Sequence, residues 1–208
     1  DHRQGQPQTD GIRLQPMNRG VVIAGSLTGL AILAGWLAAR APATAVSRDP
    51  APSAEDVVKL RTLSMILVSR NDNDPRLDKD FNELSPGAKA LFRGMYGKLP
   101  PERRNERGTI VYLLGRNLAS AEDWAFLASV AGEPPCLSLA DCSKDAPTAE
   151  GHLGDEVTLA YPSLVALKSA EAALTAGDAR IRTKARSVVE AGRTSKMPAV
   201  LRLSGRLD

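Results

Sequence analysis

The stretch SAEDVVKLRTLSMILVS, from Ser53 to Ser69, decides the fold, and its first four residues return in SAEDWAFLASVA, from Ser120 to Ala131. In each stretch a serine suited to cap a helix is followed by two acidic residues, which oppose the positive end of the helix dipole. Apolar residues then recur every three or four positions, the period of an amphipathic helix. Both stretches are therefore predicted to form helices that begin just after the serine.

Further helices are predicted along most of the chain, separated by turns rich in Pro, Gly and Ser. They are expected over residues 85–99, 102–118, 162–177 and 178–192, with a short one after residue 196. No Asn-Gly or Asp-Gly turn joins two alternating segments, so no pair of strands is predicted. The expected fold class is all-α, with antiparallel helical hairpins following an N-terminal apolar helix.

One helix has a buried face that the aliphatic residues alone predict. In the segment 85–99 that face is marked by Leu91, Met95 and Leu99, which lie four residues apart. Residues at this spacing share one side of a helix. We therefore expect these three side chains to pack into the core.

Two hairpins stand out, over residues 104–131 and 163–191, with Pro101 and Pro162 near helix starts. This arrangement resembles the HEAT-type helical repeats, which are α-solenoids of stacked helix pairs, over about Ser85 to Ala191. The resemblance implies a scaffold that offers one face of the stack to a protein partner. A compact helical bundle fits the same pattern and remains the alternative.

The run VVIAGSLTGLAILAGWLAA, from Val21 to Ala39, is 19 residues long and uncharged. It is long enough to cross a bilayer as a helix, and Ala43-Thr44-Ala45 after it has the small-residue pattern of a signal-peptide cleavage site. Residues 17–45 are therefore either a signal peptide or a transmembrane anchor. A buried helix of the folded domain is the third interpretation. The expected location is periplasmic or extracytoplasmic, with anchoring in the inner membrane if the run is retained and secretion if it is cleaved after Ala45.

The segments beside this run have simpler interpretations. Residues 1–16 are polar and rich in Gln, and are expected to be disordered or to precede the true start at Met17. Residues 46–53 are expected to be a linker, and residues 54–208 one helical domain. The chain of 208 residues is 43% hydrophobic and 25% charged, with a net charge of +3. These values are ordinary for a globular protein and point to no class of partner.

Cys136 and Cys142 are the only cysteines, and five residues separate them. An exported domain can form disulfides, so we expect this pair to close a small surface loop. A redox pair usually has the spacing Cys-x-x-Cys, and a structural zinc site needs four ligands. The chain shows neither pattern here.

No catalytic, cofactor or metal site is predicted. His2 lies in the polar tail and His152 beside a glycine in a loop, and no nucleophile motif accompanies either histidine. The aspartates between residues 72 and 80 lack the glycine that a calcium loop needs and are good turn formers. Glu122 and Asp123 lie at a helix start, where capping explains them. An enzyme that uses such carboxylates, or the 72–80 loop, remains an alternative.

The segment from residue 178 to residue 208 is basic, with eight basic and three acidic residues. Four of the basic residues are the candidate contacts for an anionic partner: Arg180, Arg182, Lys184 and Arg186. Long basic side chains beside a buried stripe are also an ordinary solvated surface. The segment has no aromatic residue for stacking on bases, so no nucleic acid is expected.

The function that these features favour is that of an exported or membrane-anchored protein-interaction or scaffold domain without catalytic activity. A protein partner is expected, and the membrane would be contacted through Val21 to Ala39 if the run is uncleaved. Binding to an anionic surface through the basic C-terminal segment is the second alternative beside the enzyme.

Overall fold

A computed structural model describes residues 51–138, 141–142 and 153–207 of the chain. The chain divides into two units, Asp1–Ala45 and Val46–Asp208, and every described residue belongs to the second. Within the described residues the fold is all-helical, with no strand. The run from Val21 to Ala39 lies outside the described residues. No helix that the structure describes combines the length and the apolar character needed to cross a bilayer.

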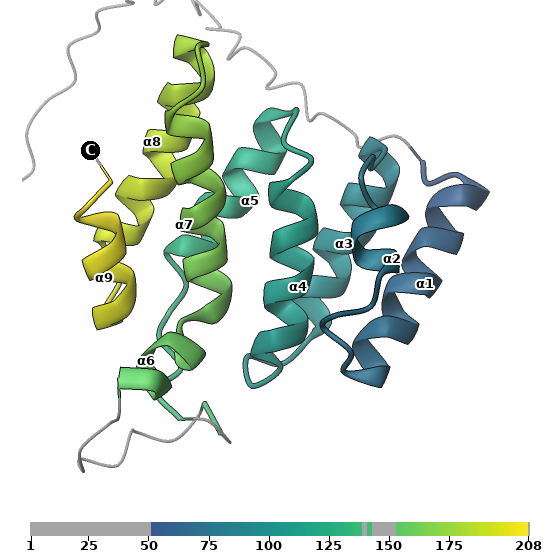
Figure 1. Ribbon diagram of the computed structural model, residues 1–208, viewed down its shortest axis with the longest axis horizontal. Helices are drawn as coiled ribbons and strands as arrows, with labels where there is room; N and C mark the ends of the chain where they lie inside the picture. Colours follow the sequence, from purple (N-terminus) through teal and green to yellow (C-terminus); the bar gives the residue numbers. More distant parts are fainter. Residues whose placement is uncertain (1–50, 139–140, 143–152, 208) are drawn as a thin grey trace, which may run out of the picture. The chain divides into compact units, whose positions relative to one another are not determined.

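The described residues form nine helices (Figure 1). In chain order they are α1 (Ala54–Ser69), α2 (Arg76–Lys79), α3 (Pro86–Lys98), α4 (Arg104–Gly115), α5 (Ala121–Ala131), α6 (Leu153–Leu159), α7 (Tyr161–Leu174), α8 (Ala179–Arg193) and α9 (Pro198–Ser204).

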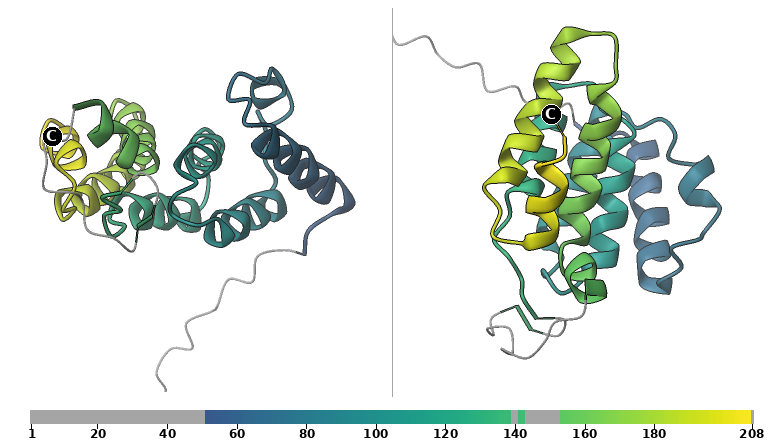
Figure 2. Two further views of the ribbon diagram at one scale, coloured as in Figure 1. Left: turned by 90° about the horizontal axis from the view of Figure 1, so that it is seen from below. Right: turned by 60° about the vertical axis from the view of Figure 1, so that its left-hand side comes forward.

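Within this unit the helices pack in two layers. Helix α7 contacts α4 on one side and α9 on the other, and these three helices lie next to one another in Figure 1. Helices α5 and α8 contact each other and α7. The left view of Figure 2, taken from below, shows α5 and α8 in one row and α4 and α7 in a second row beside it. Helix α3 contacts α4 and α1. The layer of α4, α7 and α9 therefore has one face against α5 and α8 and one face outward.

Helices α1 and α5 begin where the sequence predicts. The hydroxyl groups of Ser53 and Ser120 accept hydrogen bonds from the backbone N–H of Asp56 and Asp123, three residues later. Each aspartate in turn accepts a hydrogen bond from the backbone N–H of its serine. Both helices therefore start with a reciprocal capping box, which satisfies two N–H groups that a helix start leaves open.

The structure adds buried aromatic residues to the apolar pattern around α3, whose Leu91, Met95 and Leu99 pack against the core. Ala88, Phe92 and Tyr96 form the buried face of α3, whereas Leu91 and Met95 are only partly buried. Aromatic rings bury the larger apolar area and so turn this face inward. Phe92 packs on Phe81 with 5.8 Å between ring centroids. Phe81 itself belongs to a segment that the sequence analysis did not assign to the core, and it is fully buried.

The short helices α2 and α6 were not predicted from the sequence. Helix α2 lies in the aspartate-rich segment 72–80, and α6 immediately precedes α7. Leu77 of α2 is buried in the core. Both helices are short, of four and seven residues, and helices of this length depend on tertiary packing for stability.

Two glycines of α4 allow this helix to approach α7 closely. A Cβ atom at Gly108 would lie 2.3 Å from the ring of Tyr161, and one at Gly115 would lie 2.1 Å from Oγ of Ser169. Both distances are far below van der Waals contact, so any side chain at either position would push the helices or these residues apart. The close approach matters because Tyr161 and Ser169 also line the outward face of the layer.

Candidate functional site

A surface groove runs along the outward face of α7, between α4 and α9, and we call it the α7 groove. Its volume is about 720 Å³, within the range of protein binding pockets. Its apolar lining comprises Tyr112, Val157, Tyr161, Leu164, Val165, Ala172, Ala199 and Leu203. Its basic residues are Arg116, Lys168, Arg202 and Arg206. Gly115 and Ser169 complete the lining.

The apolar surface of the α7 groove is accessible rather than sealed. Val157 is 51% exposed, Tyr112 41% and Tyr161 37%. These three residues come from α6, α4 and α7, so no single helix carries the apolar patch. Solvent-exposed apolar surface that is grouped in a groove and bordered by polar groups marks binding sites.

Small residues shape the line where α4 meets α7. Gly115 of α4 lies against Ser169 of α7, and both line the groove. Ala172 lies one turn further along α7 and is exposed. Because none of these residues has a long side chain, the surface between the basic residues stays hollow.

Three of the four basic residues of the groove pair with acids that do not line it. Lys168 contacts Glu171 at 2.6 Å, and Arg116 contacts Asp78 at 3.0 Å. Arg202 donates a hydrogen bond to Glu156. These pairs are at the surface, where an ion pair contributes only about 0–1 kcal/mol. Arg206 forms no ion pair with any described residue.

A smaller, acidic cavity continues from the end of the groove at Tyr112 and Tyr161. Its volume is about 330 Å³, and Asp72, Asp74 and Asp78 contribute to its lining. Burial raises the pKa of Tyr161, and the charge of Asp72 raises it further. Tyr112 and Tyr161 line both cavities. The cavity on one side of these two rings is lined by acidic residues, and the α7 groove on the other side by basic residues.

The acidic cavity contains the aspartates that the alternative of an enzyme would use. Arg76 holds both carboxylate oxygens of Asp74, at 2.9 and 2.7 Å, and this contact lowers the pKa of Asp74 to about 2. Arg116 pairs with Asp78. Arginine therefore contacts both carboxylate oxygens of Asp74 and one of Asp78. No group of three or more potential metal ligands occurs in the described parts of the chain.

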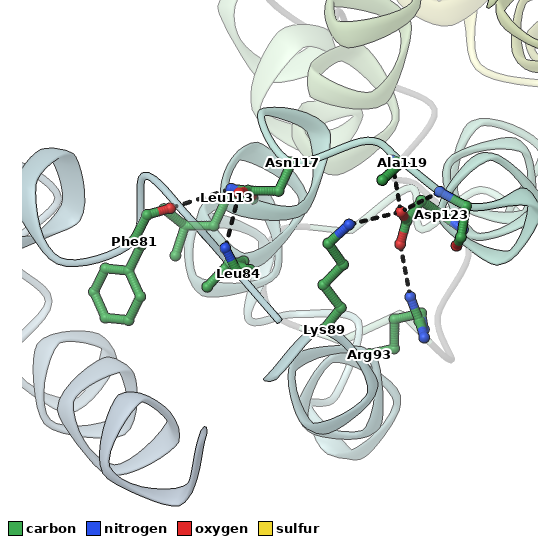
Figure 3. A network of polar contacts seen from close by, with 9 residues as sticks. Phe81, Leu84, Lys89, Arg93, Leu113, Asn117, Ala119 and Asp123 are labelled. Atoms are coloured by element: carbon green, nitrogen blue, oxygen red, sulfur yellow. Dashed lines mark hydrogen bonds and ion pairs between the residues drawn. The ribbon is translucent and has the colours of Figure 1, made fainter. Parts of the chain in front are cut away.

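Asp123, another candidate carboxylate, lies in the interior (Figure 3). Lys89 donates to its Oδ2 at 2.8 Å, and Arg93 to its Oδ1 at 2.9 Å. The backbone N–H groups of Ala119 and Ser120 also donate to Oδ2. Burial opposes the charge of Asp123, but these hydrogen bonds outweigh it and keep its pKa below the ordinary value. A buried carboxylate that accepts four hydrogen bonds, two of them from cations, serves structure rather than proton transfer.

Asn117 forms a second polar contact set in Figure 3, on the side of α4 that faces the 81–84 segment. Its side-chain oxygen accepts from the backbone N–H of Leu84, and its amide donates to the carbonyl groups of Phe81 and Leu113. These bonds fix the segment before α3 on α4, and they leave no free group for chemistry.

The two cysteines lie at disulfide distance, with their Cα atoms 4.7 Å apart. The loop that they close is held on the start of α4. Arg104 donates to Sγ of Cys136 at 2.7 Å, and the backbone N–H of Cys142 donates to Glu102 at 2.8 Å. The hydrogen bond from Cys142 lowers the pKa of Glu102. These contacts give the pair a structural position outside the α7 groove.

The basic residues predicted for an anionic partner lie on α8 and do not line the α7 groove. Arg182 donates to the carbonyl groups of Ala176 and Gly177, just after α7 ends. Arg180 is exposed beside Asp178, and Arg186 is exposed as well. Lys184 is half-buried. Their role with a partner stays a prediction.

Sequence reasoning missed the α7 groove. Arg202 and Arg206 belong to the C-terminal segment whose charge the sequence shows, but only folding brings them beside Lys168 and Arg116. The spacing of Gly108 and Gly115, two turns apart on one face of a predicted helix, was the available signal of a close helix approach. No protein-family model matches the chain, and neither a curated protein nor a solved structure matches it.

Proposed function

We propose that this chain is an exported or membrane-anchored protein-interaction domain without catalytic activity, and that the α7 groove is its binding site. The observation that carries the proposal is the grouping of exposed apolar side chains in one hollow between α4, α7 and α9, bordered by basic residues. A surface of this kind fits recognition of another protein.

The helix packing supports a scaffold role. Helices α4 and α5 contact each other, as do α7 and α8, and the two sets contact across α4 and α7 and across α5 and α8. In the proposed HEAT-like arrangement these are two antiparallel hairpins stacked side by side. The α7 groove would then lie on the face formed by one helix of each pair, where stacked repeats bind partners.

The location is the part of the proposal that depends on the apolar run from Val21 to Ala39. A reporter enzyme that is active only outside the cytoplasm, fused after Val46, tests it. Activity of that fusion, together with the N-terminal sequence of the mature chain, would separate cleavage after Ala45 from a retained anchor. An inactive fusion, together with activity of a second reporter that works only in the cytoplasm and is fused at the same position, would contradict export.

A site-specific cross-link tests the groove. A photoreactive phenylalanine analogue replaces Tyr112, which lines the groove and is exposed. The matched control places the same analogue at Thr183, an exposed residue on α8. The full chain is then illuminated in intact cells. We expect a discrete protein adduct from position 112 and none of the same mass from position 183.

A second variant decides whether that adduct depends on the groove. Ala172→Trp fills the hollow with an indole ring, and Thr183→Trp adds the same ring on α8. The adduct from position 112 should be lost with Ala172→Trp and retained with Thr183→Trp. An adduct that survives Ala172→Trp in a folded variant would show that the partner contacts another surface, and the proposed site would be wrong.

A further inference from the structure

We infer that the α7 groove binds an acidic amphipathic helix of the partner protein. This inference rests on the proposed function and names the chemistry of the ligand. Three features of the groove carry it: the sign of its charges, their spacing along the helices, and its hollow apolar base.

The charge at the edge of the groove has one sign. Basic residues line it from α4, α7 and α9, and no acidic residue is among the described residues that line it. Complementary potentials select partners and speed their encounter. The groove therefore favours a ligand that carries carboxylates beside apolar side chains.

The basic residues have the spacing of helix turns. Arg202 lies in α9 and Arg206 in the turn just after its C-cap Gly205, four residues further along, and both line the groove. The backbone N–H of Arg206 donates to the carbonyl of Leu203 at 3.0 Å, so the turn continues the winding of the helix. Neighbours at this spacing are separated by about one turn, or roughly 5–6 Å. Carboxylates on successive turns of a bound helix could therefore meet the two guanidinium groups.

The groove has the length of a short helix. Its lining on α7 extends from Tyr161 to Ala172, a span of three turns at about 3.6 residues per turn. Apolar side chains along the span, among them Leu164 and Val165, form the base. A helix lying along this base would insert its apolar stripe and hold its acidic flanks at the basic residues, which is a common mode of helix-in-groove recognition.

Two of the three acids that pair with the groove cations are well exposed and can give way at little cost, and the third, Glu156 beside Arg202, is 29% exposed. Glu171 is 40% exposed in its pair with Lys168, and Asp78 is 72% exposed in its pair with Arg116. Exposed pairs contribute little to stability. Arg206 needs no such exchange, because it pairs with no described acid.

A folded helix explains the shape better than a membrane does. Lipid headgroups would meet the basic residues, but a bilayer surface is nearly flat on the scale of a hollow of about 720 Å³. The apolar base would then stay uncovered. Anionic vesicles are therefore the competing ligand in the test.

The experiment measures binding of labelled synthetic helices to the full chain by fluorescence anisotropy. One 18-residue peptide carries a leucine stripe flanked by glutamates, and its counterpart carries lysines in place of the glutamates. We expect the acidic peptide to bind at least about ten times more tightly than the basic one, because only it complements the groove. Phosphatidylglycerol vesicles serve as the third probe, in a flotation assay.

Charge reversal locates the contact. Arg202→Glu with Arg206→Glu should weaken binding of the acidic peptide about ten-fold or more, through lost attraction and added repulsion. The matched control, Arg180→Glu with Lys184→Glu, makes the same change of charge at the same spacing on α8 and should leave binding within about two-fold of the wild type. Arg202→Gln with Arg206→Gln repeats the test without new acids, in case the reversed pair reduces folding, which circular dichroism monitors.

Each other outcome would overturn the inference. Equal weakening by the α8 pair would mean that the peptide contacts the basic residues of α8 or responds only to total charge. If both peptides bind and Ala172→Trp abolishes both interactions, the groove is the binding site but has no preference for an acidic helix. Binding of vesicles but of neither peptide would assign the basic residues to a lipid surface. Absence of any position-112 adduct in the chain without further substitutions, by contrast, would contradict the proposed function itself.

Discussion

Ser53–Asp56 and Ser120–Asp123 have the same sequence, Ser-Ala-Glu-Asp, and the same local structure. In both, the serine hydroxyl accepts from the N–H three residues later, and the aspartate accepts from the N–H of the serine. Both aspartates are buried. The two tetrapeptides differ in what the rest of the chain places against the carboxylate of the aspartate.

Helix α3 and its N-cap supply the partners of both aspartates. Ser85, its N-cap, donates its hydroxyl to Asp56 of α1. Lys89 and Arg93, one and two turns further along, donate to Asp123 of α5. One helix thus holds α1 through a hydroxyl and α5 through two cations. The comparison shows that local sequence determines the cap, whereas tertiary packing decides whether the same carboxylate forms a neutral contact or an ion pair.

The largest expected effect is that of Asp123→Ala. This change leaves the ammonium group of Lys89, whose side chain is 7% exposed, without its carboxylate. Breaking a buried pair on one side typically costs at least about 3 kcal/mol. For a domain of this size the midpoint of thermal unfolding should fall by about 6–12 °C. Asp56→Ala should lower it clearly less, because Ser85 is neutral and can turn its hydroxyl elsewhere.

Calorimetry of the two variants checks this order. A loss from Asp56→Ala as large as that from Asp123→Ala would show that the ion pairs add nothing to the cap, and the proposed difference between the two sites would disappear.

A double-mutant cycle sharpens the same comparison with a smaller expected effect. Lys89→Met combined with Asp123→Asn removes both charges and should cost less than the sum of the single changes, with a coupling of about 1–2 kcal/mol. The cycle of Ser85→Ala with Asp56→Asn should give a smaller coupling. Urea unfolding of the six variants measures the coupling energy of each cycle. Equal coupling energies would contradict the conclusion that only the aspartate of α5 is stabilised by an ion pair.

The caps could be predicted from the sequence because each is complete within four residues. The partners could not, because Lys89 and Arg93 precede Asp123 by 34 and 30 residues. Nothing in the segment 85–98 marks which of its faces meets α5. The aliphatic spacing of Leu91 and Met95 marked only the edge of the buried face, since Phe92 and Tyr96 are more deeply buried.

The candidate site shows the same limit more strongly. The helices that line the α7 groove could be predicted, with the exception of α6, and so could the basic character of the C-terminal segment. The groove itself depends on the approach of α4 to α7 at Gly115 and on the place of α9 beside α7. Both are long-range packing results, which periodicity along the chain does not contain.

The acid dependence of stability offers a third test of the two aspartates. Both have a pKa below the ordinary value of 3.8 in the folded chain. For Asp56 the main cause is the hydrogen bond from Ser85. For Asp123 burial acts in the opposite direction, and the hydrogen bond from Lys89 helps to overcome it.

Because the unfolded chain has the higher pKa, it binds more protons as the pH falls. The free energy of unfolding should therefore be unaffected by these groups above about pH 5, and should decrease as the pH drops below 3.8 toward the folded pKa values. Asp123→Asn and Asp56→Asn should each make this decrease shallower. Urea unfolding between pH 6 and pH 2 measures this decrease in the free energy of unfolding. If neither variant changes its slope, the acid sensitivity comes from groups other than these two aspartates.

The smallest expected difference is between Ser53→Ala and Ser120→Ala. Each change removes one hydrogen-bond acceptor from a helix start, and each should cost about 1 kcal/mol. The two losses should agree closely, because neither hydroxyl reaches α3, and the one further contact, of Ser120 with Glu122, lies within the same first turn of α5. Thermal unfolding of the two variants decides the point. A markedly greater loss from Ser120→Ala would mean that the cap also orients Asp123 toward Lys89 and Arg93, so that local and tertiary contacts at this helix start act as one unit.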